Sequence, residues 1–370
     1  LYLNDGAGHF QKKEGALPEI TSSGSCVAAF DFDGDGDQDL FVGGRVTPGG
    51  YPTPPQSYVL RNDGGQFRDV TDEVAPDFKF LGMVTDIVFA NLDQDPTPEM
   101  VVSGEWMPVE VFKINGGKLT PKTADFGLEK TNGWWNCFTA HDMDGDGDVD
   151  LLGGNRGLNS RLKASPEAPL TLFAADFDHN SSIDPILAWY DNGQLYPVPQ
   201  RDAIIKQLPY LKKKFVRFRN YATSTIEQVF SPEELNKAQK MEAYLMATSY
   251  FENDGNGHFT RKDLPVPAQF SPCFEIQCGD WNGDGHEDFV MVGNSYAPEV
   301  ETGRYDAGNG ALFLGDGKGN FKFVPNIESG FWATKEARDL EILNTPAGKL
   351  FLIANNDDIL EVYTLKQPVQ

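Results

Sequence analysis

The chain of 370 residues lacks several features that would assign it to a common class of protein. It has no run of about 18 apolar residues, so no segment is predicted to cross a bilayer as a helix. Basic residues are also scarce, with 31 Lys and Arg against 55 Asp and Glu and a formal net charge of −24. A surface this acidic repels nucleic-acid phosphates and anionic lipid headgroups, so we expect cations among the partners but neither nucleic acid nor a membrane.

Familiar enzyme motifs are absent as well. The chain has no Gly-x-Ser-x-Gly elbow and no His-Glu-x-x-His motif, and its five histidines lie mostly in turns or beside acidic loops. We therefore predict no catalytic residue and leave enzymatic activity uncertain. The four cysteines have no Cys-x-x-Cys spacing, which argues against zinc or redox chemistry. Buried free thiols are the simplest interpretation, with a Cys273–Cys278 disulfide as the alternative.

Glycine and proline are abundant, with 38 and 24 residues, which favours many short strands joined by tight turns. The length allows two or three ordinary domains or one large all-β domain. The opening residues 1–6 form neither an initiator methionine nor a signal sequence, so we expect an N-terminal portion, with any localisation signal, to be missing.

Two elements repeat along the chain. The first is a hairpin signal, Asn-Asp-Gly or Gly-Asp-Gly between apolar runs, at residues 4–6, 62–64, 253–255 and 315–317. The second is an acidic loop between apolar strands: Asp-Phe-Asp-Gly-Asp-Gly-Asp-Gln-Asp at 31–39, with close copies at 142–150 and 280–288. Weaker copies lie at 91–99 and 176–184, and a unit after Asp339 keeps the strands without the acids.

These repeats predict one all-β domain over residues 1–370, a β-propeller of about seven blades, with six to eight acceptable. A pair of β-sandwiches would not repeat one loop at a fixed place in every unit. Residues 199–247 have a helical period and a Ser231-Pro232-Glu233-Glu234 capping box, so we predict a helical insertion there. We expect its basic run, residues 212–214, to pack on the acidic body, or alternatively to form a lid or docking surface.

The acidic loops predict calcium sites. Oxygens at loop positions 1, 3, 5, 7 and 9 surround one point, and glycine at position 6 permits the sharp turn. The helical calcium hand needs Glu at position 12, but here position 12 is Val42, Gly153 or Met291, so position 9 closes the site. The predicted ligands are Asp31, Asp33, Asp35, Asp37 and Asp39; Asp142, Asp144, Asp146, Asp148 and Asp150; Asp176, Asp178, Asn180 and Asp184; and Asp280, Asn282, Asp284, His286 and Asp288.

We expect three strong Ca²⁺ sites and one or two weaker ones, with a structural role for the ion. The 91–99 loop carries Pro96, Pro98 and Gln94 where glycine is usual, so its metal binding stays open.

A ligand site is predicted at the opposite ends of the same strands. Aromatic and polar side chains there suit sugars or peptides, because ring faces stack and polar groups bond hydroxyls or amides. Packing between blades is the alternative for Trp134, Trp135 and Trp332. The predicted ligand-binding residues are Trp106, Trp134, Trp135, Arg156, Asn294, Tyr296, Arg304 and Trp332.

The acidic loops resemble the FG-GAP/VCBS repeat family, whose repeats build the calcium-bearing blades of integrin α-type propellers. Residues 153–160, 176–184 and 301–306 also resemble large Bacteroidetes VCBS-repeat surface proteins, which often stand beside outer-membrane nutrient-uptake systems. The resemblance implies an extracellular or outer-membrane surface protein that binds a glycan or protein. The alternatives are a polysaccharide lyase, with Tyr190, Tyr296 or Tyr305 as base beside Arg156 or Arg304, and a purely architectural subunit of a surface complex.

Overall fold

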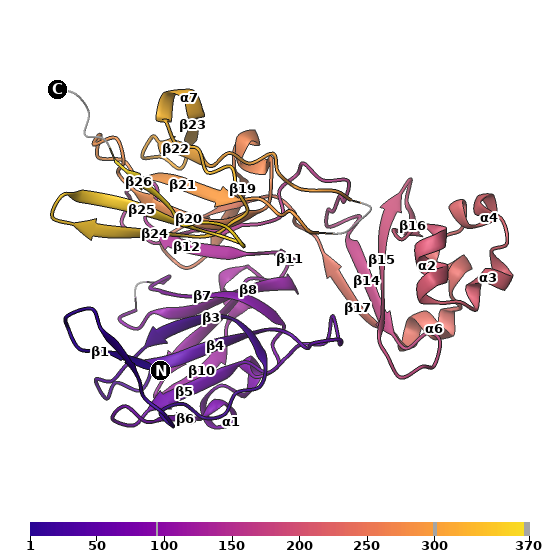
Figure 1. Ribbon diagram of the computed structural model, residues 1–370, viewed down its shortest axis with the longest axis horizontal. Coiled ribbons are helices and arrows are strands. Elements are labelled where there is room, and N and C mark those ends of the chain that lie inside the picture. Colours follow the sequence, from indigo (N-terminus) through magenta and orange to yellow (C-terminus); the bar gives the residue numbers. More distant parts are fainter. Residues whose placement is uncertain (94, 299–301, 366–370) are drawn as a thin grey trace.

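The computed structural model describes residues 1–93, 95–298 and 302–365. Strands dominate it and form antiparallel sheets, so the expectation of an all-β chain is confirmed. Figure 1 shows a large body built from most of these sheets and a smaller part that projects from it.

The body consists of sheets in which successive strands pair with their neighbours in the chain. The first is β3 (Ser23–Phe30), β4 (Asp39–Val46), β5 (Tyr58–Asn62) and β6 (Phe67–Asp69). The second is β7 (Met83–Ala90), β8 (Glu99–Met107), β9 (Glu110–Asn115) and β10 (Lys118–Pro121), with β11 (Gly133–Trp134) added beside β8. The third is β12 (Cys137–His141), β13 (Asp150–Gly154), β18 (Ser249–Asn253) and β19 (Phe259–Asp263). The fourth is β20 (Cys273–Gly279), β21 (Asp288–Gly293), β22 (Ala311–Gly315) and β23 (Phe321–Val324), and the fifth is β24 (Ala337–Thr345), β25 (Gly348–Asn355) and β26 (Glu361–Thr364).

Short elements complete the body. A hairpin of β1 (Tyr2–Asn4) and β2 (Phe10–Lys12) forms a sheet of its own. The helical turns are α1 (Thr71–Val74), η1 (Pro76–Phe78), η2 (Thr123–Phe126), η3 (Val266–Gln269) and α7 (Asn326–Ser329).

The five sheets stand face to face in chain order. Their first strands lie next to one another, because β3 contacts β7, β7 contacts β12, β12 contacts β20, and β20 contacts β24. In β8, which is the second strand of its sheet in chain order, almost every residue is buried, because sheets pack on both of its faces. Aromatic rings fill the spaces between sheets, as where Phe30 stacks on Phe89 at 4.5 Å between ring centroids. This is blade-like packing, while closure into a ring and the number of blades stay predictions.

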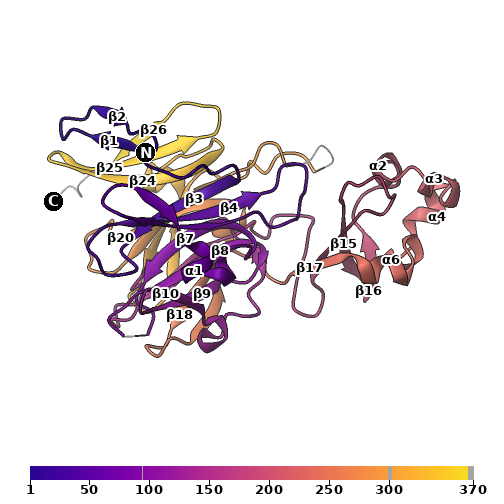
Figure 2. The same cartoon turned by 90° about the horizontal axis from the view of Figure 1, so that it is seen from below.

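The projecting part is inserted between β13 and β18, in the middle of the third sheet (Figures 1 and 2). Its sheet runs β16 (Gln194–Pro197), β15 (Asp184–Asp191), β14 (Leu170–Ala175), β17 (Gln239–Ala243). Its helices are α2 (Arg201–Gln207), α3 (Leu211–Lys214), α4 (Phe218–Ala222), α5 (Ile226–Val229) and α6 (Pro232–Lys237). Apolar residues of the helices, including Ile204 and Leu208, pack against Phe173 and Ile186 of the sheet.

The insert differs from expectation in two ways. It contains four strands besides helices, and the 176–184 loop lies in it between β14 and β15 rather than in the array of sheets. The spacing of the repeats assigned this loop to the array of sheets, because its strand–loop–strand pattern is the same as that of the loops in the array. The basic residues 212–214 end α3, which Figure 1 shows on the side of the insert away from the body. The capping box at Ser231 is present, with Glu234 N–H donating to Ser231 Oγ at 3.3 Å.

All four cysteines are free thiols, with Cys137 and Cys273 buried and Cys26 and Cys278 half-buried. The alternative Cys273–Cys278 disulfide does not form. Both residues lie on β20, and a strand rises by about 3.3 Å per residue, which separates their Cα atoms by far more than a disulfide spans.

Candidate metal loops and ligand pocket

One carboxylate fixes the backbone of every acidic loop. The residue at position 9 begins the second strand, is buried, and accepts a hydrogen bond from the backbone N–H at position 2. The pairs are Phe32–Asp39 at 3.2 Å, Leu92–Glu99 at 2.9 Å, Met143–Asp150 at 3.0 Å, Phe177–Asp184 at 3.2 Å and Trp281–Asp288 at 3.0 Å. Burial raises the pKa of Asp39, and it raises the pKa of Asp150 to about 6.

The carboxylate at position 1 closes the loop from the other side. Asp31 accepts hydrogen bonds from the backbone N–H groups of Gly34 at 2.8 Å and Gly36 at 2.9 Å. Both glycines have positive φ, 79° and 94°, a backbone conformation that costs glycine little. Asp142 and Asp280 bind their loops in the same way. In these three loops, two carboxylates therefore hold the turn that presents the remaining acids.

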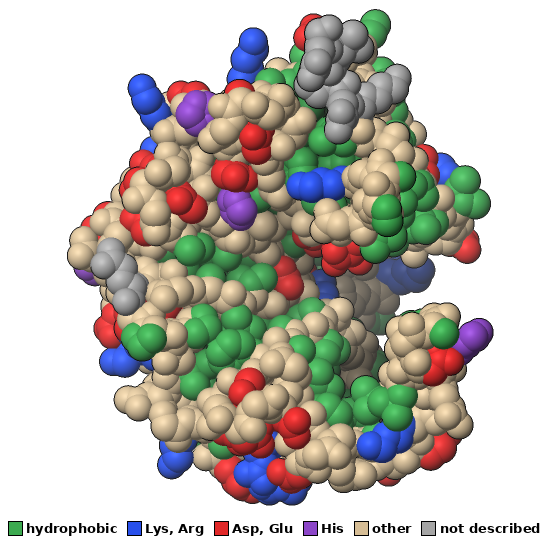
Figure 3. Space-filling view, turned by 90° about the vertical axis from the view of Figure 1, so that its left-hand side faces the viewer, with side chains coloured by type: hydrophobic (Ala, Val, Ile, Leu, Met, Phe, Trp, Pro, Cys, Tyr) green, Lys and Arg blue, Asp and Glu red, His purple; other side chains and the backbone are tan. Residues whose placement is uncertain are grey.

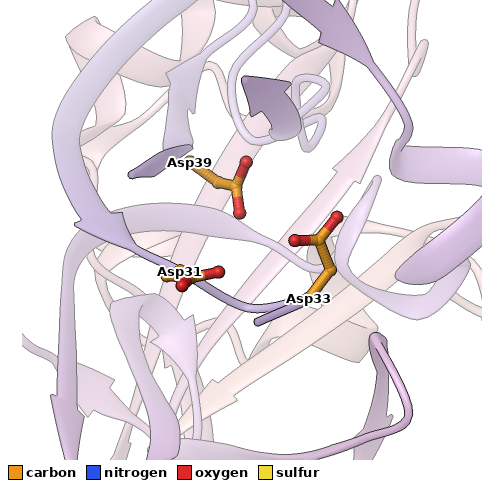
Figure 4. A group of neighbouring side chains, drawn as sticks. All are labelled: Asp31, Asp33 and Asp39. Carbon is orange, nitrogen blue, oxygen red and sulfur yellow. The ribbon is translucent and has the colours of Figure 1, made fainter. Parts of the chain in front are cut away.

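The loops bring carboxylates together. Figure 4 shows Asp31, Asp33 and Asp39 turned toward a common space. Ligand oxygens lie within 4.8 Å of one another in four groups: Asp31, Asp33 and Asp39; Asp142, Asp144 and Asp146; Asp176, Asp178 and Asp184; and Asp93, Asp95 and Glu99. Such groups of hard oxygens could hold a metal ion, and their charge, size and number suit Ca²⁺.

Two of these loops have a carboxylate oxygen that lacks a partner. Asp148 Oδ1 and Asp178 Oδ1 are buried and have no hydrogen-bond partner among the described residues. Burial, followed by repulsion from Asp146 and Asp150, raises the pKa of Asp148 to about 7. A bound cation at either loop would satisfy the oxygen and offset the repulsion, so the residues present fit the metal that the loop pattern predicts.

Other predicted ligands are placed less favourably. In the 280–288 loop the carboxylates do not gather into a comparable group of three among the described residues. Asn282 instead donates to Asp284 Oδ2 at 2.9 Å, and this bond, with the N–H of His286, lowers the pKa of Asp284. In the 31–39 loop, Asp35 and Asp37 are outside the group, and Asp37 accepts from the N–H of Gly64 at 3.1 Å. In the 176–184 loop, Asn180 Oδ1 accepts from the N–H of Ser182 at 2.7 Å.

The 91–99 loop already contains a cation. Lys113 extends from β9, and its ammonium group pairs with Asp93, with Asp95 Oδ2 at 2.9 Å and with Glu99 Oε1 at 3.6 Å. Burial opposes the charge, but the bonds to Asp93 and Asp95 prevail and raise the pKa of Lys113. Gln94, which together with Pro96 and Pro98 left metal binding by this loop open, lies outside the described residues. Sequence reasoning missed Lys113, because the loop motif contains no position on the third strand.

A pocket of about 350 Å³ lies at the other end of the same strands. Arg45, Glu105 and Arg156 reach it from the ends of second strands, and Phe274 and Arg338 from the beginnings of first strands. Leu187 of the inserted sheet lines it as well.

Figure 3 shows the opposite side of the body, the side toward which the β24–β25 turn points in Figure 1. Asp and Glu side chains are spread over this face, and the face is hollowed between its upper and lower halves.

Arginines cover the aromatic rings in and around the pocket. The Cζ atom of Arg156 lies 4.2 Å from the ring centroid of Tyr305 and 5.1 Å from that of Trp134. Arg338 lies over Phe274 at 4.1 Å, outside the predicted set. Arg304 lies over Tyr296 at 4.8 Å, although neither residue lines this pocket. The rings therefore act as cation–π partners here.

The predicted ligand-binding residues are only partly brought together. Trp134, Trp135 and Arg156 line the pocket. Trp106 is buried edge-on against Trp134, and Asn294 is fully buried, with its amide bonded to backbone oxygens such as Gly308 O at 2.9 Å.

Trp332 is 47% exposed and is not among the pocket residues. The pattern missed Arg45, Glu105, Phe274 and Arg338 as site residues. Arg45 and Glu105 carried a signal, since each follows a second-strand glycine.

Two stretches of the chain match the FG-GAP-like repeat. They are residues 1–42 and 91–153, which include three of the acidic loops. No curated protein matches the chain. Among solved structures it is similar to the V. cholerae biofilm matrix protein Bap1, with 12% identity and a TM-score of 0.36 over 93% of this chain and 63% of that chain. It is also similar to BBS1N in complex with ARL6DN, with 10% identity and a TM-score of 0.25 over 94% and 93% of the two chains.

The chain thus spans about 63% of the length of the Bap1 chain. In the part of the chain that the structure describes, no helix has the length and hydropathy that a membrane crossing requires. The 301–306 stretch begins at Glu301, which lies outside the described residues.

Proposed function

We propose that this chain is an extracellular binding module in which Ca²⁺ stabilises one end of the strands and a ligand binds at the other. The observation that carries the proposal is this separation along the same strands. The carboxylate groups lie in the loops between first and second strands, whereas the pocket lies where first strands begin and second strands end.

The metal has a structural role in this proposal. The carboxylates at positions 1 and 9 already bind the loop backbone, so a Ca²⁺ ion among them joins the end of the first strand to the start of the second. The match to the FG-GAP-like repeat over three of these loops supports calcium as the ion and a surface location. The pocket supports binding, since its volume is in the range of small-molecule sites and it combines aromatic, polar and charged side chains.

The test combines thermal melting with ligand binding. Chelation should lower the melting temperature of the chain, and calcium should restore it. A panel of glycans and surface proteins, tested on calcium-loaded protein, should yield a ligand whose binding is lost in Arg156→Gln and kept in Arg217→Gln, an exposed arginine of the insert. A chelator that leaves the melting temperature unchanged would contradict the calcium part. Turnover of a bound polysaccharide would favour the lyase alternative over a binding module.

A further inference from the structure

We infer that this pocket, the ligand site of the proposed function, binds its ligand through a carboxylate held by Arg156. The inference rests on the proposed function and adds the chemical class of the ligand. It is argued from the ring faces, the charges and the unpaired donors of the pocket.

The ring faces favour an anion over a neutral sugar. A sugar that stacks needs an open aromatic face. Here the guanidinium group of Arg156 lies against the rings of Trp134 and Tyr305, and Arg338 lies over Phe274. Trp135 is fully buried. What these residues offer to a ligand is therefore guanidinium N–H groups.

The charges in the pocket single out Arg156. Arg45 Nη2 pairs with Glu105 Oε2 at 2.7 Å, and Arg338 pairs with the buried Glu336. Arg156 has no carboxylate partner among the described residues, although the chain carries 55 acidic residues. Since no described carboxylate pairs with Arg156 in so acidic a protein, its charge is suited to an anion supplied by the ligand.

Two unpaired hydrogen-bond donors in the pocket could orient the bound anion. Arg156 Nε and Trp134 Nε1 are buried and have no hydrogen-bond partner among the described residues. Because aromatic rings flank the guanidinium group, its N–H edge is the part left to donate. Nε together with one Nη forms the planar fork that binds both oxygens of a carboxylate. The unpaired indole N–H of Trp134, whose ring packs against the same guanidinium group, supplies a third donor.

The net charge of −24 favours a carboxylate over a phosphate. The field of the whole chain repels anions, and it repels a dianion more strongly than a monoanion. The same carboxylate could belong to a free small acid or to a uronic acid in a glycan, and the test separates these sources.

The experiment is isothermal titration of calcium-loaded protein with galacturonate, trigalacturonate and neutral maltotriose at one ionic strength. We expect a carboxylate ligand to bind and maltotriose not to bind. Arg156→Gln should weaken binding at least tenfold. Arg156→Lys, which keeps the charge without the fork, and Trp134→Phe, which keeps the ring without the N–H, should each weaken it several-fold. Arg217→Gln is the matched control and should bind like the wild type.

The outcomes distinguish this inference from the proposed function. Binding of trigalacturonate alone supports a uronic acid within a glycan, and equal binding of the monomer supports a small acid. Maltotriose binding that Arg156→Gln abolishes would overturn the carboxylate and keep the pocket as a ligand site. Carboxylate binding that Arg156→Gln leaves unchanged would also overturn the inference. Failure of all three ligands, with the calcium-dependent melt intact in every variant, would overturn the carboxylate and leave the proposed function to other ligands.

Discussion

The 142–150 and 91–99 loops share one backbone hydrogen bond and differ in the charges that surround their carboxylates. In both, the position 9 carboxylate accepts the N–H of position 2, from Met143 to Asp150 and from Leu92 to Glu99. The first loop gathers Asp142, Asp144 and Asp146 with no basic partner among the described residues, whereas the second encloses the ammonium group of Lys113. The comparison teaches that gathered carboxylates at this place can be balanced by a lysine from the third strand, and we propose that Ca²⁺ takes this part where the lysine is lacking.

The strand register explains the difference. Lys113 follows Phe112, which pairs with Met100 directly after Glu99. The equivalent residue in the third sheet is Glu252, which follows Phe251 opposite Leu151, and it pairs with Lys262. In the first sheet the equivalent is Arg61, whose guanidinium group bonds to Asp63 instead. Only the second sheet of these three sends a basic side chain into its own loop.

Removal of calcium should have the largest effect. If the loops without a lysine each bind Ca²⁺, every site contributes about 2.7 kcal/mol at a hundredfold excess of the ion over its Kd, so several sites together change stability by far more than one substitution. We expect a chelator to lower the melting temperature by about 10 °C or more. Magnesium at the same concentration should restore less stability than calcium. Equal melting curves with and without chelator would contradict the distinction between loops that bind a metal ion and the loop that encloses a lysine.

A third group of carboxylates, on the first strands, has neither metal loop nor lysine, and it should make stability depend on pH. Burial, then repulsion from Asp86 and Asp339, raises the pKa of Glu275 to about 8, and burial raises that of Asp86 to about 6. An acid with a raised folded-state pKa stabilises the fold at low pH and loses that contribution as pH rises through its folded pKa. We expect stability to fall between pH 6 and 8 by up to about 1.4 kcal/mol per pH unit.

Glu275→Gln tests this expectation, because the amide keeps the shape and cannot ionise. Denaturant unfolding at pH 6, 7 and 8 with calcium present should show a flatter profile for the variant than for the wild type. Identical slopes for the two proteins would show that Glu275 does not cause the fall. The outcome separates carboxylates that use a cation from those that stay protonated.

A matched pair of substitutions at position 3 sharpens the comparison directly. Asp144→Ala should remove one Ca²⁺ per chain, with a stability loss of about 2 kcal/mol in calcium, because the 142–150 group loses one of its gathered ligands. Asp93→Ala, at the same position of the lysine-bearing loop, should leave the stoichiometry unchanged. Titration calorimetry of both variants counts the ions, and a lost ion in Asp93→Ala would contradict the role given to Lys113.

Lys113→Met should have the smallest effect on stability when calcium is present. Without metal, the variant leaves Asp93, Asp95 and Glu99 uncompensated, and we expect a loss of about 1 to 3 kcal/mol. With calcium, the emptied loop should bind an additional ion and recover part of this loss. Lys118→Met, an exposed change on β10, is the control for removing one positive charge. A variant that loses stability equally with and without calcium would show that the loop cannot accept an ion.

The sequence predicted the features that repeat and missed those that depend on contacts between strands. The loops, the glycine turns and the two opposite ends of the strands followed from the spacing of residues 31–39 and its copies. Lys113 could not be predicted, because its role depends on strand register. Arg338 was missed because no repeated pattern surrounds it, and the sheet of the insert was missed because β14 and β15 have the same strand–loop–strand pattern as a body sheet.

The insert has a consequence for the order of folding. Strands β13 and β18 pair directly, with Gly153 opposite Ser249, although residues 155–248 lie between them. Bringing two strands together across a disordered chain becomes harder as the chain lengthens, and each doubling adds about 0.6 kcal/mol of lost entropy. If the insert folds first, around Phe173, Ile186 and Ile204, the connection between β13 and β18 is no longer a long disordered chain. The two strands are then separated only by the distance between the two ends of the folded insert. We therefore expect the third sheet to form after the insert has folded, and mutations in the insert core to delay assembly of the array.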